Sequence, residues 1–205
     1  MDGPVLRSIT VADPAEPWQA AGFAVDDNRA QVGAVELLLV GEGGGITSWA
    51  LEGAAAGEVD GLATRGADGG ASEPEPGVHP NLTTSLDHLV ITSHDVERTV
   101  AALTGRGFEV RRRWLNAGRC YTFFRVGETI LELIGPAEPD GKPWPARFYG
   151  LAFTVADLEG TAERLGSLLG PVRDALQPGR RIATLRPDAG LSVPVAFMSP
   201  GKGAI

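Results

Sequence analysis

The feature that most constrains this sequence is an internal repeat. The segment "LDHLVITSHDVERTV", residues 86–100, returns in pattern as "FYGLAFTVADLEGTA", residues 148–162. In each copy an alternating apolar stretch is followed by an aspartate, Asp95 or Asp157, and then by apolar residues at helical spacing. An aspartate at that point is typical of a helix N-cap. Each copy therefore predicts a strand that leads into a helix, and the chain is expected to fold as repeated modules.

Further strands complete each module. After the first helix, "FEVRRRW", "RCYTFFRV" and "TILELIGP" predict three strands, and "RRIATLRP" and "VPVAFMSP" supply strands after the second. Helices are expected over about 95–105 and 157–169, with an uncertainty of about 2–4 residues at each end. We expect the two modules to span 84–136 and 147–200 of one domain, residues 84–205.

A shorter copy stands at the front of the chain. "LRSITVADPAEPWQAAGFAV" predicts a strand, a capping Asp13 and a short helix, and "VGAVELLLVG" resembles "VGETILELIG". "ITSWALEG" starts another strand. We expect residues 1–56 to form a truncated module whose sheet extends the main one or packs on it. Residues 57–83 are expected to be a linker, in which "EVDGLATR" is a candidate helix and "GADGGASEPEPG" has the composition of a mobile segment.

The composition limits the kinds of binding partner that the chain can have. The chain has 205 residues, 43% of them hydrophobic, and a formal net charge of -8 without a basic stripe, which argues against nucleic acid or an anionic membrane as partner. Cys120 is the single cysteine, which excludes an intramolecular disulfide and fits a reducing compartment. No signal-peptide pattern opens the sequence, and "VELLLV" is too short to span a bilayer. We expect a cytoplasmic monomer or homodimer that binds a small molecule.

Modules of the order βαβββ, opening with "DHLVI" and closing with "LEL", resemble the vicinal oxygen chelate superfamily. That superfamily includes glyoxalase I, bleomycin-resistance proteins and extradiol dioxygenases. The likeness covers residues 85–200 and part of 4–53, and the layout is similar to that of bacterial glyoxalase-like proteins, a label that describes a fold and no function. The resemblance implies an α+β fold. Paired modules form a cupped mixed sheet with helices on the convex side and a small-molecule site on the concave side.

In metal-using members of the superfamily, each module contributes one ligand from its first strand and one from its last. The resemblance carries these positions to His88 and Glu132 in the first full module. Strand alternation places His88 on one face with Leu86 and Val90, and it places Glu132 on the same, concave side of the sheet. We therefore expect His88 and Glu132 to lie within reach of one another or of a bound water.

The second full module has no matching ligands. Gly150 stands at the position equivalent to His88, and Ala196 at the position equivalent to Glu132, so both are expected to leave open space for a ligand. A divalent catalytic site normally has three protein ligands, so a metal held by His88 and Glu132 is not favoured and no cofactor is expected. Residues elsewhere with suitable donor atoms are Glu36, His79 and His94.

Without a metal, His88 and Glu132 can form an acid–base pair, because a carboxyl group beside an apolar wall has a raised pKa. The alternative is a simple hydrogen bond in a half-buried cup.

One face of the 119–125 strand is expected to line the cup, either the face of Tyr121, Phe123 and Arg125 or the face of Cys120, Thr122 and Phe124. The predicted ligand-binding residues are Tyr121, Phe123, Arg125, Trp144, Arg147, Tyr149, Arg180 and Arg186. Their aromatic rings suit a flat ligand, and arginine suits a carboxylate or phosphate. The alternatives are core aromatics and a charged surface strand.

Three hypotheses follow. The first is a glyoxalase-like small-molecule-binding protein or metal-independent enzyme that acts on a small, anionic or aromatic ligand. The second is a divalent-metal-dependent lyase, isomerase or dioxygenase whose missing ligands come from elsewhere. The third is a drug-sequestering protein of the bleomycin-resistance type, in which the cup binds and nothing reacts.

Overall fold

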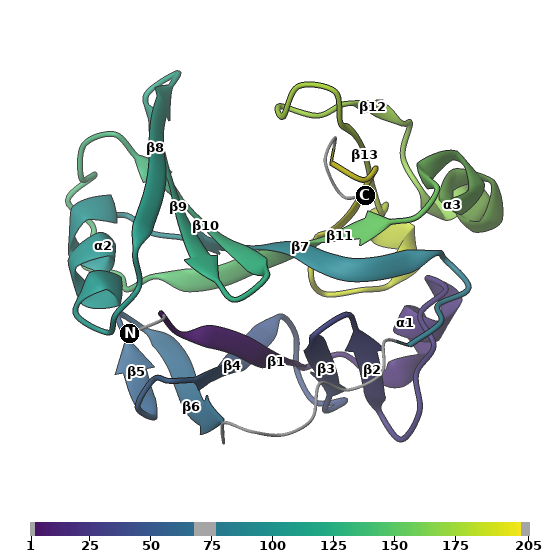
Figure 1. The fold of residues 1–205 in the computed structure, drawn as a ribbon, viewed down its shortest axis with the longest axis horizontal. Helices are drawn as coiled ribbons and strands as arrows, with labels where there is room; N and C mark the ends of the chain where they lie inside the picture. The colour runs from purple at the N-terminus through teal and green to yellow at the C-terminus, as the bar shows by residue number, and fades with distance from the viewer. Residues whose placement is uncertain (1–2, 68–76, 202–205) are drawn as a thin grey trace.

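The computed structural model describes residues 3–67 and 77–201. Two mixed β-sheets lie one above the other (Figure 1). The main sheet has eight strands in the order β12-β13-β14-β11-β7-β10-β9-β8, and the front sheet has six in the order β2-β3-β1-β4-β6-β5.

The main sheet consists of two βαβββ modules, as predicted. The first contains β7 (Thr83–Thr92), α2 (Val96–Thr104), β8 (Val110–Asn116), β9 (Arg119–Val126) and β10 (Thr129–Pro136). The second contains β11 (Arg147–Val155), α3 (Leu158–Leu165), β12 (Arg173–Asp174), β13 (Arg181–Thr184) and β14 (Val195–Met198). Single 3-10 turns, η1 (Gly166–Leu168) and η2 (Pro187–Ala189), lie within the second module. The α+β fold class is therefore confirmed.

Both predicted helix caps are present. The Asp95 carboxylate accepts a hydrogen bond from the backbone N–H of Arg98 at 3.0 Å, and that of Asp157 accepts one from the N–H of Glu159 at 3.1 Å. Helix α3 is shorter than expected because Gly166, at its C-cap, has a φ of 51°, a positive value outside the helical range that glycine adopts readily.

The first strands of the two modules, β7 and β11, pair antiparallel at the centre of the main sheet, and each pairs in parallel with the last strand of its own module. In Figure 1, β8 on one side and β12 and β13 on the other rise away from the front sheet. The main sheet is therefore curved. We call its face turned away from the front sheet the cup.

The front sheet repeats this plan with fewer strands. It contains β1 (Val5–Val11), α1 (Ala15–Ala20), β2 (Arg29–Val32), β3 (Val35–Leu39), β4 (Ile46–Glu52), β5 (Gly57–Val59) and β6 (Leu62–Ala67). Strands β1 and β4 pair antiparallel at its centre, β3 runs parallel to β1, and β6 runs parallel to β4. The front of the chain thus holds two truncated modules, where one had been predicted.

Two local predictions for the front of the chain are wrong. The segment "EVDGLATR" forms the β5–β6 hairpin and no helix, with Asp60 and Gly61 at φ 47° and 89° in its turn, because Asp-Gly suits a two-residue turn with positive φ. Residues 57–67 thus belong to the sheet, and the rest of the expected linker lies largely in residues 68–76, outside those described. Asp13 does not cap α1, whose N-cap is Pro14; its carboxylate instead accepts from Trp18 Nε1 at 3.0 Å.

The core lies between the sheets, so the front sheet packs on the convex face of the main sheet and does not extend it. The ring of Phe23 lies 5.0 Å from that of Phe153, and the ring of Trp49 lies 5.4 Å from that of Phe148. These aromatic contacts join residues of the front segment to β11, and all four belong to one hydrophobic cluster or pack directly against it. Helices α2 and α3 contact β10 and β13 and lie at opposite ends of the molecule (Figure 1). The front sheet covers the middle of the convex face of the main sheet (Figure 1).

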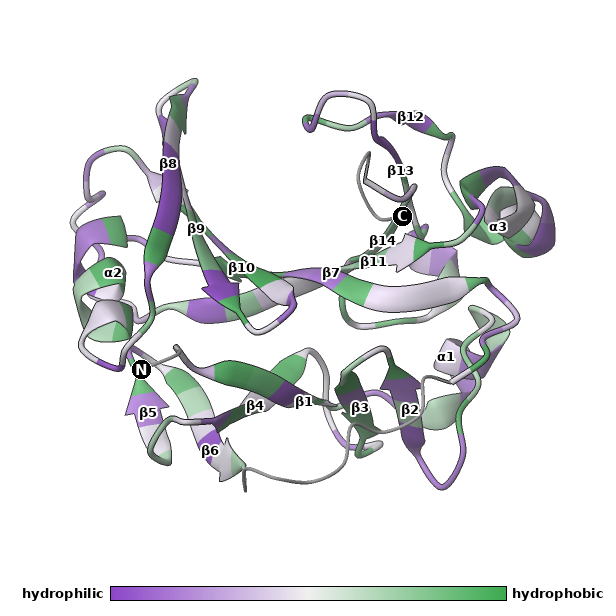
Figure 2. Cartoon of the chain, viewed as in Figure 1, coloured by the Kyte–Doolittle hydropathy of each residue, from purple (hydrophilic) through white to green (hydrophobic). Residues whose placement is uncertain are grey.

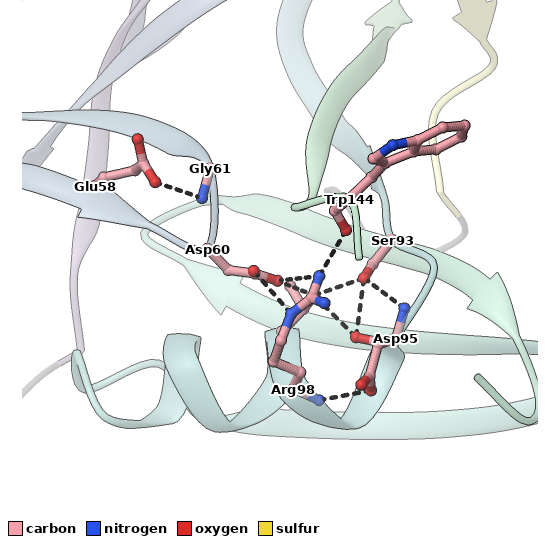
Figure 3. A network of polar contacts seen from close by, with 8 residues as sticks. Glu58, Asp60, Gly61, Ser93, Asp95, Arg98 and Trp144 are labelled. Atoms are coloured by element: carbon pink, nitrogen blue, oxygen red, sulfur yellow. Dashed lines mark hydrogen bonds and ion pairs between the residues drawn. The ribbon is translucent and has the colours of Figure 1, made fainter. Parts of the chain in front are cut away.

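A polar network fixes the β5–β6 hairpin to α2 (Figure 3). The Asp60 carboxylate accepts from Arg98 Nε at 2.9 Å and from the Thr99 hydroxyl at 2.5 Å. Arg98 also donates to the backbone carbonyl of Trp144 at 2.9 Å. The network therefore ties the front sheet, helix α2 and the segment between the modules together.

Among the described residues, none of the helices has the length and apolar character needed to cross a membrane.

Candidate active site in the cup

Two neighbouring residues of β7, Asp87 and His88, both point toward the cup. The pairing of β7 with β11 skips Asp87, since Ala152 pairs with His88 and Phe153 with Leu86. An extra residue of this kind is a β-bulge, which interrupts strand alternation. Leu86 is therefore buried in the core at 4% exposure. The prediction that it shares a face with His88 is wrong.

The Asp87 carboxylate contacts three other side chains of the site. One of its carboxylate oxygens lies 2.9 Å from His88 Nδ1, and the other lies 2.6 Å from a terminal nitrogen of Arg180 and accepts from the Thr154 hydroxyl at 3.0 Å. Burial raises the pKa of Asp87, but the hydrogen bonds and charges of His88 and Arg180 outweigh it and lower the pKa to about 2. Asp87 is therefore ionised at neutral pH. As an acceptor it orients His88 with Nδ1 protonated and Nε2 free.

Glu132 faces His88 from β10. Its carboxylate lies 3.6 Å from His88 Nε2, so the two side chains come within reach as expected, although this separation is too long for a hydrogen bond. No described residue donates a hydrogen bond to Glu132, and its side chain is 16% exposed. Burial raises the pKa of Glu132, the charge of His88 lowers it and that of Asp87 raises it, and the net direction is upward. The result is a carboxylate with raised basicity that opens to the cup.

The wall beside Glu132 is aromatic. Tyr121 and Phe123 of β9 pair with Ile134 and Glu132, and they lie on the cup, whereas Cys120, Thr122 and Phe124 are buried on the other face. This settles which face of β9 lines the cup. Arg125 shares the face of Phe123 and donates to the carbonyl of Gly127 at 2.7 Å.

Strand β8, largely hydrophilic in Figure 2, adds residues that the sequence did not single out. Trp114 pairs with Tyr121, and their ring centroids are 5.1 Å apart. Arg112 pairs with Phe123 and is exposed. The alternation of "VRRRW" relative to "RCYTFFRV" is the signal that could have placed both on the cup.

The arginines that the sequence predicted as ligand-binding residues lie in different places. Arg180 lies at the cup, but its positive charge is matched by Asp87, and its Nε donates to the carbonyl of Ser199 at 2.9 Å. Arg186 is exposed and donates to the carbonyl of Leu169 at 3.2 Å, with no contact to the Asp87 cluster among the described residues. Arg147 opens β11 beside Thr92.

The two remaining predicted residues lie near the start of β11, with Trp144 before it and Tyr149 within it. Tyr149 is 55% exposed, and the pairing of β11 skips it. Trp144 is 51% exposed, with its ring 5.1 Å from that of His94. Neither residue contacts His88 or Glu132, so the structure does not bring them into the acid–base cluster.

The expected open space beside Gly150 is not there. A Cβ at Gly150 would lie 2.8 Å from the carbonyl oxygen of Pro194, so backbone fills that side. Ala196, in contrast, is half-buried.

Within the described ranges, no group of three or more His, Cys, Asp or Glu residues could hold a metal ion. His88 and Glu132 supply donors, but Asp87 is engaged by Arg180 and Thr154. The other candidates point elsewhere. Glu36 pairs with Arg29, and His94 with Asp140. His79 is buried between the N–H of Ala24 and the carbonyl of Gln31, where burial lowers its pKa. The described side chains therefore do not fit the ligand set of a divalent catalytic metal.

Comparison with known proteins gives a family and a set of solved folds. Residues 85–182 match the family model of the Glyoxalase/Bleomycin resistance protein/Dioxygenase superfamily. A methylmalonyl-CoA epimerase from Mycobacterium tuberculosis is 22% identical, with 58% of this chain and 90% of that chain covered and a TM-score of 0.48. A hypothetical protein from Bacillus halodurans C-125 is 18% identical, with 59% and 97% covered and a TM-score of 0.48.

A variant of the methylmalonyl-CoA epimerase of Streptomyces coelicolor, in complex with 2-nitronate-propionyl-CoA, is 23% identical, with 58% and 99% covered and a TM-score of 0.47. No curated protein matches the chain. Likenesses this remote assign no activity. The family match and the two βαβββ modules agree, and residues 85–182 form a region of the Glyoxalase/Bleomycin resistance protein/Dioxygenase superfamily type.

Proposed function

We propose that the cup binds a small organic ligand and that Glu132 exchanges a proton with it without a metal. One observation carries the proposal. The Glu132 carboxylate is largely buried, lacks a hydrogen-bond donor among the described residues, has a raised pKa and faces the cup. A carboxylate in that state is a stronger base than one in water.

The residues around Glu132 support the same chemistry. Glu132 accepts a proton from a C–H group next to a ligand carbonyl, and the electron pair of that bond stays on the ligand as an enolate. The proton then returns to the ligand or passes to His88 Nε2, 3.6 Å away. Asp87 holds the imidazole in place and stabilises it when it is protonated, as a carboxylate does for histidine in other acid–base sites.

The ligand is expected to be flat or apolar over part of its length. Phe123 lies directly beside Glu132 across the β9–β10 pair, and Tyr121 and Trp114 continue the aromatic surface. Aromatic walls with a few placed polar groups are typical of small-molecule sites.

Hydrogen–deuterium exchange tests the proposal. The protein is incubated in D₂O with a panel of 2-oxo acids, 3-oxo acids and aryl ketones, and loss of the C–H signal is followed by proton NMR. We expect exchange of at least one compound above the uncatalysed rate. It should be abolished by Glu132→Gln and kept by the control Glu163→Gln, because Glu163 is exposed on α3. Exchange that persists in Glu132→Gln would refute the assigned base.

Binding in the same panel distinguishes the sequestration hypothesis. Saturation-transfer signals that depend on Tyr121 and Phe123, together with no exchange in any compound, would support a cup that only binds.

A further inference from the structure

A cavity of about 440 Å³ lies at one end of the cup. Its lining includes Thr92 at the end of β7, Ile134 of β10, Arg119 at the start of β9 and Arg147 at the start of β11. His94 and Asp140 close it from the loops. A volume of this size lies within the range of small-molecule sites.

The two arginines of this cavity are free to bind an anion. Among residues 3–67 and 77–201, neither Arg119 nor Arg147 forms an ion pair or a side-chain hydrogen bond. The cavity's carboxylate, Asp140, is already matched, because His94 Nδ1 lies 2.6 Å and Lys142 Nζ 3.5 Å from it. The cavity therefore presents unpaired positive charge in a chain whose net charge is -8.

Strand pairing relates the lining of this cavity to the acid–base cluster. Ile134 pairs with Thr92, which pairs with Arg147, and the next cup-facing residue of β10 is Glu132. Two residues along a strand span about 7 Å. Arg119 pairs with Pro136, one step further from Glu132. Arg147 is thus level with Ile134, two residues from Glu132, and Arg119 is level with Pro136, four residues from Glu132. A group bound between the arginines would therefore lie about 7–13 Å from Glu132 along β10.

We propose that Arg119 and Arg147 form an oxyanion subsite that binds a carboxylate or phosphate group of the ligand. Arginine binds both groups through paired N–H donors, and such charge-assisted bonds are stronger than neutral ones. The anion subsite stands on its own observations. Its further implication, that the substrate is an acid with its reactive C–H about 7–13 Å from the anionic group, rests on the proposed function.

Titration with simple anions tests the subsite. Inorganic phosphate and succinate are added separately to ¹⁵N-labelled protein at constant ionic strength, and backbone amide shifts are followed. We expect saturable shifts confined to the residues around 117–119, 134–136 and 147. Both Arg119→Gln and Arg147→Gln should weaken binding about tenfold or more, because each variant removes charge-assisted hydrogen bonds to the anion. The two probes show whether carboxylate or phosphate is preferred.

The controls separate this proposal from the proposed function. Arg173→Gln, an exposed arginine on β12 without an ion pair among the described residues, should leave the anion affinity unchanged. Glu132→Gln should abolish proton exchange and leave phosphate affinity within about twofold. Melting temperatures equal to wild type would show that the arginine variants fold. Shifts spread over many surface arginines without saturation, or affinity unchanged in the Arg119→Gln/Arg147→Gln double variant, would overturn the subsite.

Discussion

Oδ2 of Asp87 lies 2.6 Å from a terminal guanidinium nitrogen of Arg180, and both side chains are 11% exposed. This ion pair crosses the centre of the main sheet, from β7 to the loop before β13. It also supplies the anion that Arg180 had been expected to take from a ligand. Since His88 binds the other oxygen of the same carboxylate, the position of the imidazole depends on the ion pair.

The stability losses from removing the two partners of this ion pair should not be additive. Asp87→Asn leaves Arg180 largely buried without a counterion, and Arg180→Gln leaves Asp87 without its cation. We expect each single variant to lose stability and the double variant to lose less than the sum, with a coupling energy of about 1–3 kcal/mol. Urea unfolding of the four proteins at pH 7 measures it. Strictly additive losses would show that the two side chains do not interact in solution.

The contribution of Asp87 should depend on pH in the acid range. Its pKa falls from 3.8 to about 2 on folding, so the unfolded chain binds the proton more readily. The stabilisation, about 2 kcal/mol, is complete above pH 3.8 and is lost as pH falls toward 2. The stability gap between wild type and Asp87→Asn should therefore narrow between these pH values. A gap that stays constant would mean that Asp87 keeps its ordinary pKa.

The contribution of Glu132 to stability is expected to change with pH in the opposite direction to that of Asp87. Its folded pKa is raised above 4.5, so the folded protein holds this proton more tightly than the unfolded chain does. Stability is therefore lost as pH rises through this range, and ionised Glu132 destabilises the protein at pH 7. Glu132→Gln should melt at a higher temperature than wild type at pH 7, and this advantage should vanish below pH 4.5. A lower melting temperature at pH 7 would contradict it. Stability gained with activity lost is typical of a functional group.

Periodicity predicted the parts of the fold that repeat. The alternation of "LDHLVITS" and the aspartates that follow the first strands placed β7, β11 and both helix starts, because capping and burial are local properties of the sequence. The same reasoning placed His88 and Glu132 on the cup. It could not place Asp87, because a bulge is defined by the partner strand, and the partner is chosen by tertiary packing.

The front sheet shows a different limit. Residues 57–67 are rich in glycine and alanine and lack a clear alternation, so their sequence predicts a linker. The Asp-Gly pair at residues 60–61 is a hairpin signal, but only pairing of β6 with β4 makes the hairpin part of a sheet. Likewise, Arg119 and Arg147 line one cavity only once the strands of the two modules have paired.

The Asp60 network should contribute strongly to stability. Asp60→Ala removes the acceptor of Arg98 and Thr99, and Thr99 is fully buried. We expect a loss of about 1–3 kcal/mol, because the variant removes hydrogen bonds to a charged acceptor. Glu58→Ala, in the same hairpin (Figure 3), removes a carboxylate that accepts only from the exposed N–H of Gly61 at 3.2 Å, so its loss should be within about 0.5 kcal/mol. Equal losses in urea unfolding would show that the network adds nothing specific.

Gly150 should tolerate no side chain. A Cβ there would meet the carbonyl oxygen of Pro194 at 2.8 Å, and the N–H of Leu151 donates to that same oxygen at 3.0 Å, so the backbone cannot move away without losing a hydrogen bond. We expect Gly150→Ala to lose about 1–3 kcal/mol, as overpacking of a tight site does. Gly66→Ala is the control, because its Cβ would meet the carbonyl of Ala54 at 3.7 Å, an ordinary contact.

Because the Pro194 backbone fills the space beside Gly150, Gly150→His should fail to complete a metal site with His88 and Glu132. Zinc should therefore not raise the melting temperature of this variant above that of its zinc-free form. A stable Gly150→His variant with stoichiometric zinc would show that the Pro194 segment moves aside and that the second module can still supply a ligand.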